Sequence, residues 1–231
     1  MNLDYLQLGN GRLGSLIADE VEKHLKLKVE FARVDSNFGL MVPRLSQTKS
    51  RIKNLVICIS PTKHNHWLWS ELFLGMAEQV LNQEIQIEKL IMISSSRVYD
   101  GNSKGIITAQ MKPQPNSVRA KQILEAEHQL KGMANSYHII RCAGLYGGSY
   151  KKYADILRNG NKDNVFRFGV NVNQVAQQVV ESLKSDVGTC RILLLTDGYG
   201  YLNGYKRPFN EIEVFSDKMR LLKNSSSECR V

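Results

Sequence analysis

Gly9-Asn10-Gly11-Arg12-Leu13-Gly14 stands between a short apolar run, Tyr5–Leu8, and a segment of helical period, Leu13–Leu25. A second β-rich run, Lys28–Val34, follows within about 30 residues, so the glycines lie in a strand–turn–helix–strand context. In this context the first glycine permits a tight turn, the second lets a pyrophosphate approach the backbone, and the third lets helix and strand pack closely. The free N–H groups and the positive end of the helix then face the anion. The stretch therefore predicts a dinucleotide-binding turn.

The alternation of apolar runs and helical segments continues along the chain and predicts an α/β fold, a Rossmann-type doubly wound, mainly parallel sheet. Further strands are predicted over Asn54–Ser60, Lys89–Ser94, Tyr137–Cys142 and Arg191–Thr196, and helices over Trp67–Leu81, Ser117–Lys131, Tyr153–Arg158, Val172–Leu183 and near Asn210–Leu222. Residues 36–50 offer only a short polar stretch, so we expect a reduced or missing strand–helix unit there. We interpret residues 1–231 as a single domain in which 149–231 contribute a reduced substrate-binding portion, with a frayed tail around 225–227.

Composition excludes several classes of protein. The 231 residues are 42% hydrophobic and 23% charged, which is typical of a globular domain with a full core. The net charge of +9 is spread along the chain: residues 1–60 carry 9 basic and 6 acidic side chains, 61–141 carry 9 and 7, and 142–231 carry 13 and 9. Without a basic block we expect no nucleic-acid binding.

Targeting and metal-binding signals are also missing from the sequence. The N-terminus has no basic region followed by an apolar one, and no apolar run is long enough to cross a membrane, so we expect a cytoplasmic protein without a membrane partner. The four cysteines form no C-x-x-C pair and are interpreted as reduced, buried thiols. His64 and His66 lie two residues apart without a nearby carboxylate, so no metal site is expected.

The end of the second strand bears on the choice of cofactor. An acidic residue about 20 positions after the glycines holds the ribose hydroxyls of NAD, whereas an arginine there accommodates the additional phosphate of NADP. Asp35 and Arg33 both lie near that distance, so the spacing leaves NAD and NADP open. We favour NADP because Arg33 can pair with phosphate or stack on adenine.

Four segments, taken in order after the glycine turn, carry a resemblance to a known family. They are residues 93–101 (ISSSRVYDG), 115–121 (PNSVRAK), 141–148 (RCAGLYGG) and 171–176 (NVNQVA). In this order the chain resembles the NAD-dependent epimerase/dehydratase family, the extended and atypical branch of the short-chain dehydrogenase/reductases. The resemblance covers most of residues 3–196, and it implies an oxidoreductase or epimerase acting on a small carbonyl or nucleotide-sugar substrate.

The resemblance also implies roles for single residues. Ser95 takes the place of the family hydroxyl that hydrogen-bonds the substrate, and Arg12, Leu13, Ser60 and Pro61 join the glycines around the cofactor. In the family a Tyr-x-x-x-Lys pair lies one helical turn apart; its lysine holds the nicotinamide ribose, and its tyrosine exchanges a proton with the substrate. Here the lysine position falls on Lys121 and the tyrosine position on Ser117.

The serine at the tyrosine position puts standard hydride-transfer chemistry in question, because the pKa of an aliphatic hydroxyl lies far above the value of about 10 of a phenol. Three interpretations remain open. The fold binds a cofactor without catalysis, as a sensor or assembly partner; another group, such as Tyr99, Tyr146 or His64, transfers the proton; or water or the substrate supplies it.

The helix predicted over Trp67–Leu81 is apolar around more than one face and needs cover on two sides. In the family this helix and the one bearing Lys121 pack against a second subunit. A homodimer is therefore a possible state, and cover by the C-terminal segment of the same chain explains the pattern equally well.

Overall fold

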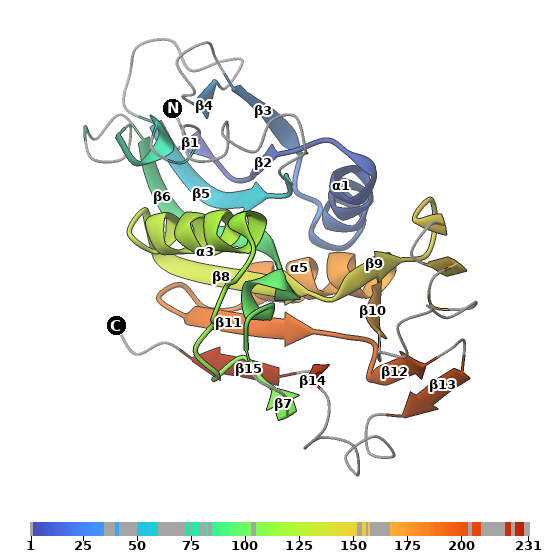
Figure 1. Ribbon diagram of the computed structural model, residues 1–231. Coiled ribbons are helices and arrows are strands. Elements are labelled where there is room, and N and C mark those ends of the chain that lie inside the picture. The colour runs from blue at the N-terminus through green and yellow to red at the C-terminus, as the bar shows by residue number, and fades with distance from the viewer. Residues whose placement is uncertain are drawn as a thin grey trace.

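The computed structural model describes residues 2–34, 40–41, 50–59, 73, 75–78, 82, 85–102, 105–151, 154–155, 157, 167–202, 205–208, 220–222 and 225–228. Its centre is a nine-stranded sheet, shown in Figure 1. The strands run in the order β15 (Ser225–Glu228), β11 (Cys190–Leu195), β8 (Ala134–Cys142), β6 (Ile85–Ser95), β5 (Ser50–Ile57), β2 (Leu6–Leu8), β3 (Glu30–Val34) and β4 (Leu40–Met41), and β1 (Asn2–Leu3) pairs with β5.

The six central strands, from β11 to β3, are parallel, and the two edge strands are antiparallel. Register places Leu8 of β2 opposite Ile57 of β5 and Ala32 of β3. The carboxyl ends of these neighbouring strands therefore meet at one edge of the sheet, where loops and helix termini can form a site.

Helices cover both faces of this sheet (Figure 1). Helix α1 (Arg12–Leu25) and helix α5 (Val172–Lys184) pack against one another on one face, and α3 (Val118–Lys131) packs on β6 and β8. Side chains of the strands alternate accordingly. The core on the α3 side contains Leu55, Ile57, Leu90 and Met92 with Ile123, Ala126 and Leu130, and the core on the α1 and α5 side contains Val56, Ile91, Ile93 and Ile140 with Ile17, Val21, Val175 and Val179.

Two smaller sheets extend this layer. Strands β9 (Gly144–Tyr146), β10 (Arg167–Asn171), β12 (Tyr199–Leu202) and β13 (Tyr205–Pro208) form a four-stranded sheet that starts directly after β8. Strand β7 (Gly105–Ile107), which follows the 3-10 turn η1 (Ser96–Tyr99), pairs with β14 (Arg220–Leu222). Within the described part of residues 149–231, β11 and β15 belong to the central sheet and α5 covers it, whereas β10, β12 and β13 lie in the four-stranded sheet and β14 pairs with β7.

The predicted α/β class and all six predicted strands are confirmed, with boundaries that differ by a few residues. The reduced or missing unit expected over 36–50 falls mostly outside the described residues, of which 40–41 form the antiparallel strand β4. Two predictions are wrong. Residues 220–222 form β14 instead of the end of a helix, and 225–227 belong to β15 instead of a frayed tail, because both segments pair with strands distant in the sequence. No helix in the described part of the chain is both long and apolar enough to cross a membrane.

Candidate functional site

A cavity of about 330 Å³ opens at the carboxyl edge of the sheet. Its walls come from the N-terminus of α1, the ends of β5, β6 and β8, the turn η1, and the first turns of α3. Strand β2 has β3 on one side and β5 on the other, and the chain reaches β3 through α1, so the strand order reverses beside β2. Such a switch point is where doubly wound folds bind their ligands.

The glycine turn between β2 and α1 is fixed by close packing. Gly9 has a φ of +109°, and a Cβ atom there would lie 2.2 Å from the carbonyl oxygen of Cys58. A Cβ atom on Gly14 would lie 2.2 Å from the carbonyl oxygen of Gly9. A Cβ atom on Gly11, which lines the cavity, would meet nothing within 4 Å. Two glycines are thus needed by the turn itself, and the third keeps space open beside the helix terminus.

A buried side chain braces this turn from below. The Gln7 amide donates to the carbonyl oxygens of Gly9, at 2.9 Å, and Gly14, at 2.7 Å, while its own oxygen accepts from the Tyr5 hydroxyl at 2.7 Å. Burial raises the pKa of Tyr5, so its phenol stays protonated and able to donate. Gln7 itself is fully buried, an unusual position for an amide that these three hydrogen bonds satisfy.

The residues of this turn fit the phosphates of a dinucleotide. Gly11 is the N-cap of α1 and supplies no capping side chain, and the first turn of the helix contains no acidic residue. The positive end of a 14-residue helix therefore faces the open space beside Gly11. This is the arrangement that attracts an anion through backbone N–H groups.

Arg12 joins the turn to the loop after β9. Its guanidinium lies 5.0 Å from the centroid of the Tyr150 ring and donates to the carbonyl oxygen of Ser149 at 3.1 Å. Burial raises the pKa of Tyr150, opposed by Arg12 and by a hydrogen bond from the Leu13 backbone. The Tyr150 phenol therefore lies at the N-terminus of α1, next to the space left by Gly11.

The start of α3 holds Ser117, the predicted counterpart of the family tyrosine. Its Oγ caps the helix by accepting from Ala120 N–H at 3.2 Å, and donates to Asp100 Oδ2 at 2.5 Å. Burial would raise the pKa of Asp100, but hydrogen bonds from Ser117 and Asn116, together with the charge of Arg97, lower it overall. Ser117 thus joins α3 to the loop after η1 and is not among the residues that line the cavity.

Lys121 lies one helical turn after Ser117, is exposed, and does not line the cavity either. The positions of α3 that do are Arg119 and Ile123, also one turn apart. The helical phase explains the difference, because Ala120, Ile123, Ala126 and Leu130 are buried against the sheet. The apolar positions of the helix include Ile123, but Arg119 lies outside that phase, so the sequence alone does not identify the pair that lines the cavity.

Ser94 and Ser95, at the end of β6, both line the cavity. The Ser95 Oγ accepts from Arg97 N–H at 3.2 Å and so starts η1. The Ser94 hydroxyl points to the core, where it donates to Glu127 Oε1 at 2.5 Å. Of the predicted catalytic residues, the structure brings Ser95 to the cavity together with Gly11, Arg12, Leu13 and Gly14.

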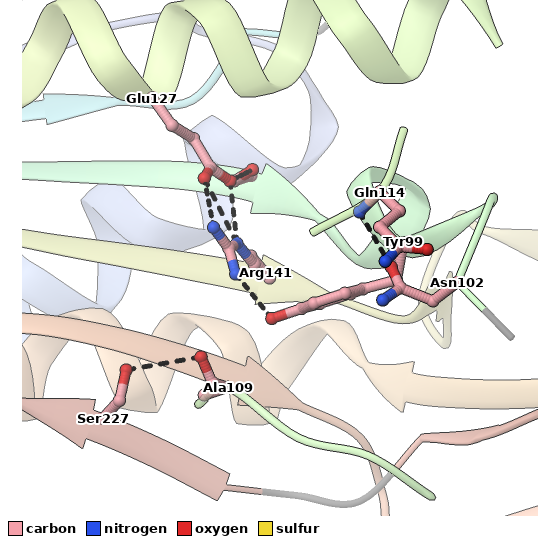
Figure 2. A network of polar contacts seen from close by, with 8 residues as sticks. Tyr99, Asn102, Ala109, Gln114, Glu127, Arg141 and Ser227 are labelled. Carbon is pink, nitrogen blue, oxygen red and sulfur yellow. Dashed lines mark hydrogen bonds and ion pairs between the residues drawn. The ribbon is translucent and has the colours of Figure 1, made fainter. Parts of the chain in front are cut away.

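Tyr99 belongs to a buried polar network beneath the cavity, which Figure 2 shows. The Arg141 guanidinium contacts both carboxylate oxygens of Glu127, with Nη2 at 2.6 Å from Oε2, and its Nη1 donates to the Tyr99 hydroxyl oxygen. Arg141 is 2% exposed, and Glu127 and Tyr99 are fully buried. Burial raises the pKa of Tyr99 despite the nearby arginine. The phenol of Tyr99 therefore ties η1 to β8 and α3 and does not reach the cavity.

Other predicted residues lie elsewhere. The Tyr146 hydroxyl donates to Asp197 Oδ2 at 2.8 Å, outside the cavity lining. Arg33 is in β3, but its side chain lies outside the described parts of the structure, as do Asp35, Ser60, Pro61 and His64.

Comparison with known proteins relates this chain to a family model and to several solved structures. A family model for the RmlD substrate binding domain matches residues 76–169, less than half of the chain, from before β6 to β10. None of the curated protein sequences matches this chain.

Several solved structures share the fold. A protein of Methylobacillus flagellatus assigned as an NAD-dependent epimerase/dehydratase has a TM-score of 0.66 at 15% identity, over 96% of this chain and 89% of that one. A dTDP-4-dehydrorhamnose reductase of Clostridium acetobutylicum has a TM-score of 0.60 at 18% identity, over 96% and 84%. MoeE5, solved with UDP-glucose and NAD, has a TM-score of 0.64 at 15% identity, over 96% and 85%. The resemblance predicted from the sequence is confirmed, and at these identities the structural likeness is one of fold.

Proposed function

We propose that this protein binds a nicotinamide dinucleotide, NADP in preference to NAD, at the glycine turn and uses it as an oxidoreductase or epimerase on a small carbonyl or nucleotide-sugar ligand. The observation that carries the proposal is the open space at Gly11, where the N-terminus of α1 meets the cavity at the switch point of the sheet. MoeE5, which shares the fold, was solved with NAD and a nucleotide sugar, and this supports the same ligand classes here.

The residues around the cavity suggest how the ligands are arranged. The backbone of Gly11, Arg12 and Leu13 would hold the phosphates, and Ser95 would hydrogen-bond the second ligand. The dinucleotide supplies hydride chemistry when bound. The part of this chain is to orient the two ligands side by side and to exclude water from between them.

Dinucleotide binding is tested by titrating the protein with NADPH and with NADH and following the fluorescence of the reduced nicotinamide. Gly11→Asp adds a carboxylate in front of the helix terminus and is expected to weaken binding at least tenfold. The matched control is Asn135→Asp, which adds the same charge at an exposed position near the amino end of β8, on the opposite edge of the sheet. Equal affinity of the two variants would remove the glycine turn as the binding site.

A second candidate function, dinucleotide binding without turnover, is favoured by the face that α3 turns to the cavity. Arg119 and Ile123 lie one helical turn apart there, like the family's catalytic pair, yet neither side chain can exchange a proton with a substrate at neutral pH. A sensor or assembly partner needs no such group.

The variant Arg119→Tyr separates the two candidates, because it puts a phenol on the cavity face of α3 and leaves the buried Ile123 unchanged. Consumption of NADPH is measured with carbonyl compounds and with UDP-glucose as substrates. Turnover by the unchanged protein supports the enzyme. Dinucleotide binding without turnover, with activity appearing only in Arg119→Tyr, supports the non-catalytic protein.

A further inference from the structure

The charges that line the cavity all have one sign. Three ionised side chains contribute to its wall, Arg12, Arg97 and Arg119, and no aspartate or glutamate does so among the described residues. Arg12 lies at the glycine turn, held over Tyr150. The other two come from η1 and from the first turn of α3, at the end of the cavity away from the turn.

Arg97 and Arg119 are close enough to affect one another. Burial and the charge of Arg97 lower the pKa of Arg119, as expected when two cations lie near one another, although both residues remain exposed to solvent in part. Asp100, on the loop after η1, accepts hydrogen bonds from Asn116 and Ser117 at the cap of α3, and the charge of Arg97 helps to lower its pKa. Two cations at a cavity wall lower their mutual repulsion when an anion lies between them.

We propose that Arg97 and Arg119 form an oxyanion subsite, which takes a carboxylate or phosphate group of the second ligand beside Ser95. The planar guanidinium fork matches both groups, with two parallel N–H donors for two oxygens. The Ser95 hydroxyl, whose oxygen accepts from Arg97 N–H, keeps its hydrogen for the same ligand. The proposal rests on the proposed function, which assigns the dinucleotide to the other end of the cavity.

In this arrangement the two ends of the cavity divide the ligands by their charge. Phosphates of the dinucleotide use the backbone and the helix terminus, and the oxyanion of the second ligand uses side chains. An acidic ligand gains charge-assisted hydrogen bonds from the two arginines and a neutral carbonyl compound does not, so the subsite selects acidic ligands over neutral ones.

The test titrates two small anions, malonate and inorganic phosphate, into the protein without NADPH and with NADPH in excess, and measures heat of binding. At least one anion is expected to bind, and its dissociation constant is expected to rise fivefold or more in Arg97→Gln and in Arg119→Gln. Both arginines are exposed in part, so folded variants are expected, and far-ultraviolet circular dichroism checks this. The control Arg191→Gln removes a partly exposed arginine paired with Glu228 on β15, and should leave anion binding unchanged.

Preference for malonate over phosphate identifies a carboxylate ligand, and the reverse identifies a phosphate. No binding of either anion, or equal binding by the arginine variants and the unchanged protein, overturns the subsite. NADPH affinity of each variant is measured alongside. If NADPH binds and the anions do not, the subsite fails and the proposed function stands. If the anions bind through the arginines while NADPH does not bind at all, the proposed function fails instead.

Discussion

His138 in β8 is expected to make the stability of this protein fall as the pH is lowered from neutral. Its side chain is 1% exposed, its Nε2 lies 3.0 Å from the Thr189 hydroxyl, and its Nδ1 has no partner among the described residues. Burial, with the positive charges of Lys89 and Arg191, lowers the pKa of His138 to about 4. The imidazole is therefore neutral in the folded protein at all but acidic pH.

The magnitude follows from the difference between the folded and unfolded states. The ordinary pKa of a histidine is 6.5, so below that pH the unfolded chain binds a proton that the folded protein does not bind until about pH 4. One pKa unit corresponds to about 1.36 kcal/mol, and the lowering of the pKa therefore corresponds to about 3 kcal/mol. This part of the free energy of unfolding is present above pH 6.5, falls between pH 6.5 and about 4, and is constant below.

The assay is urea unfolding, followed by circular dichroism between neutral pH and pH 4.5. His138→Gln keeps a polar group near Thr189 but cannot titrate. Between neutral pH and pH 4.5, the free energy of unfolding of this variant should therefore fall by about 2–3 kcal/mol less than that of the unchanged protein. The carboxylates titrate in both proteins, so their contribution to the pH dependence of the free energy of unfolding is the same and cancels in the difference. His128→Gln, an exposed histidine on α3, is the control. Parallel pH profiles for the unchanged protein and His138→Gln, or a His138 resonance titrating near its ordinary value, would refute the reasoning.

Three further predictions concern stability, each measured by urea unfolding at neutral pH. Glu127→Gln should cost about 3–5 kcal/mol because it leaves the buried Arg141 charge without its partner; the exposed Glu125→Gln should cost almost nothing, and similar values for both would contradict the ion pair. Gly14→Ala should cost about 1–3 kcal/mol through its clash with the Gly9 carbonyl, unlike Gly132→Ala, whose Cβ atom meets nothing closer than 3.8 Å. Lys89→Met should cost about 1–3 kcal/mol because the carbonyls of Ser182 and Leu183 at the end of α5 lose their buried donor; an unchanged midpoint would show that water replaces the ammonium.

The sequence predicted the central layer well because its signals are local. The parallel strands of the central sheet are apolar runs buried on both faces, and the helices between them carry an apolar stripe. The glycine turn was also predictable, since Gly14 is required by a contact within one strand–turn–helix unit and Gly9 by its positive φ, although a Cβ atom on Gly9 would also meet the Cys58 carbonyl after β5.

The remaining features depend on contacts that have no local signal. Strand β14 pairs with β7 and strand β15 pairs with β11. The residues 220–222 and 225–228 carry no sequence pattern that predicts these partners. The cavity-facing residues of α3 were missed for a related reason. Spacing alone put Ser117 and Lys121 one turn apart on the same face, and only the packing of the helix on β6 and β8 decides which face that is.

Strand β15 closes one edge of the sheet with almost no apolar side chain of its own. Ser225 and Ser227 pair with Leu194 and Ile192 of β11, so the strand contributes backbone hydrogen bonds and hydroxyl groups instead of core. A short strand with polar side chains protects against edge-to-edge aggregation. It pairs with the backbone of β11, which would otherwise be free to pair with strands of other molecules. Proteolytic trimming or a disruptive fusion near Ser225 should therefore damage solubility well before it damages the cavity.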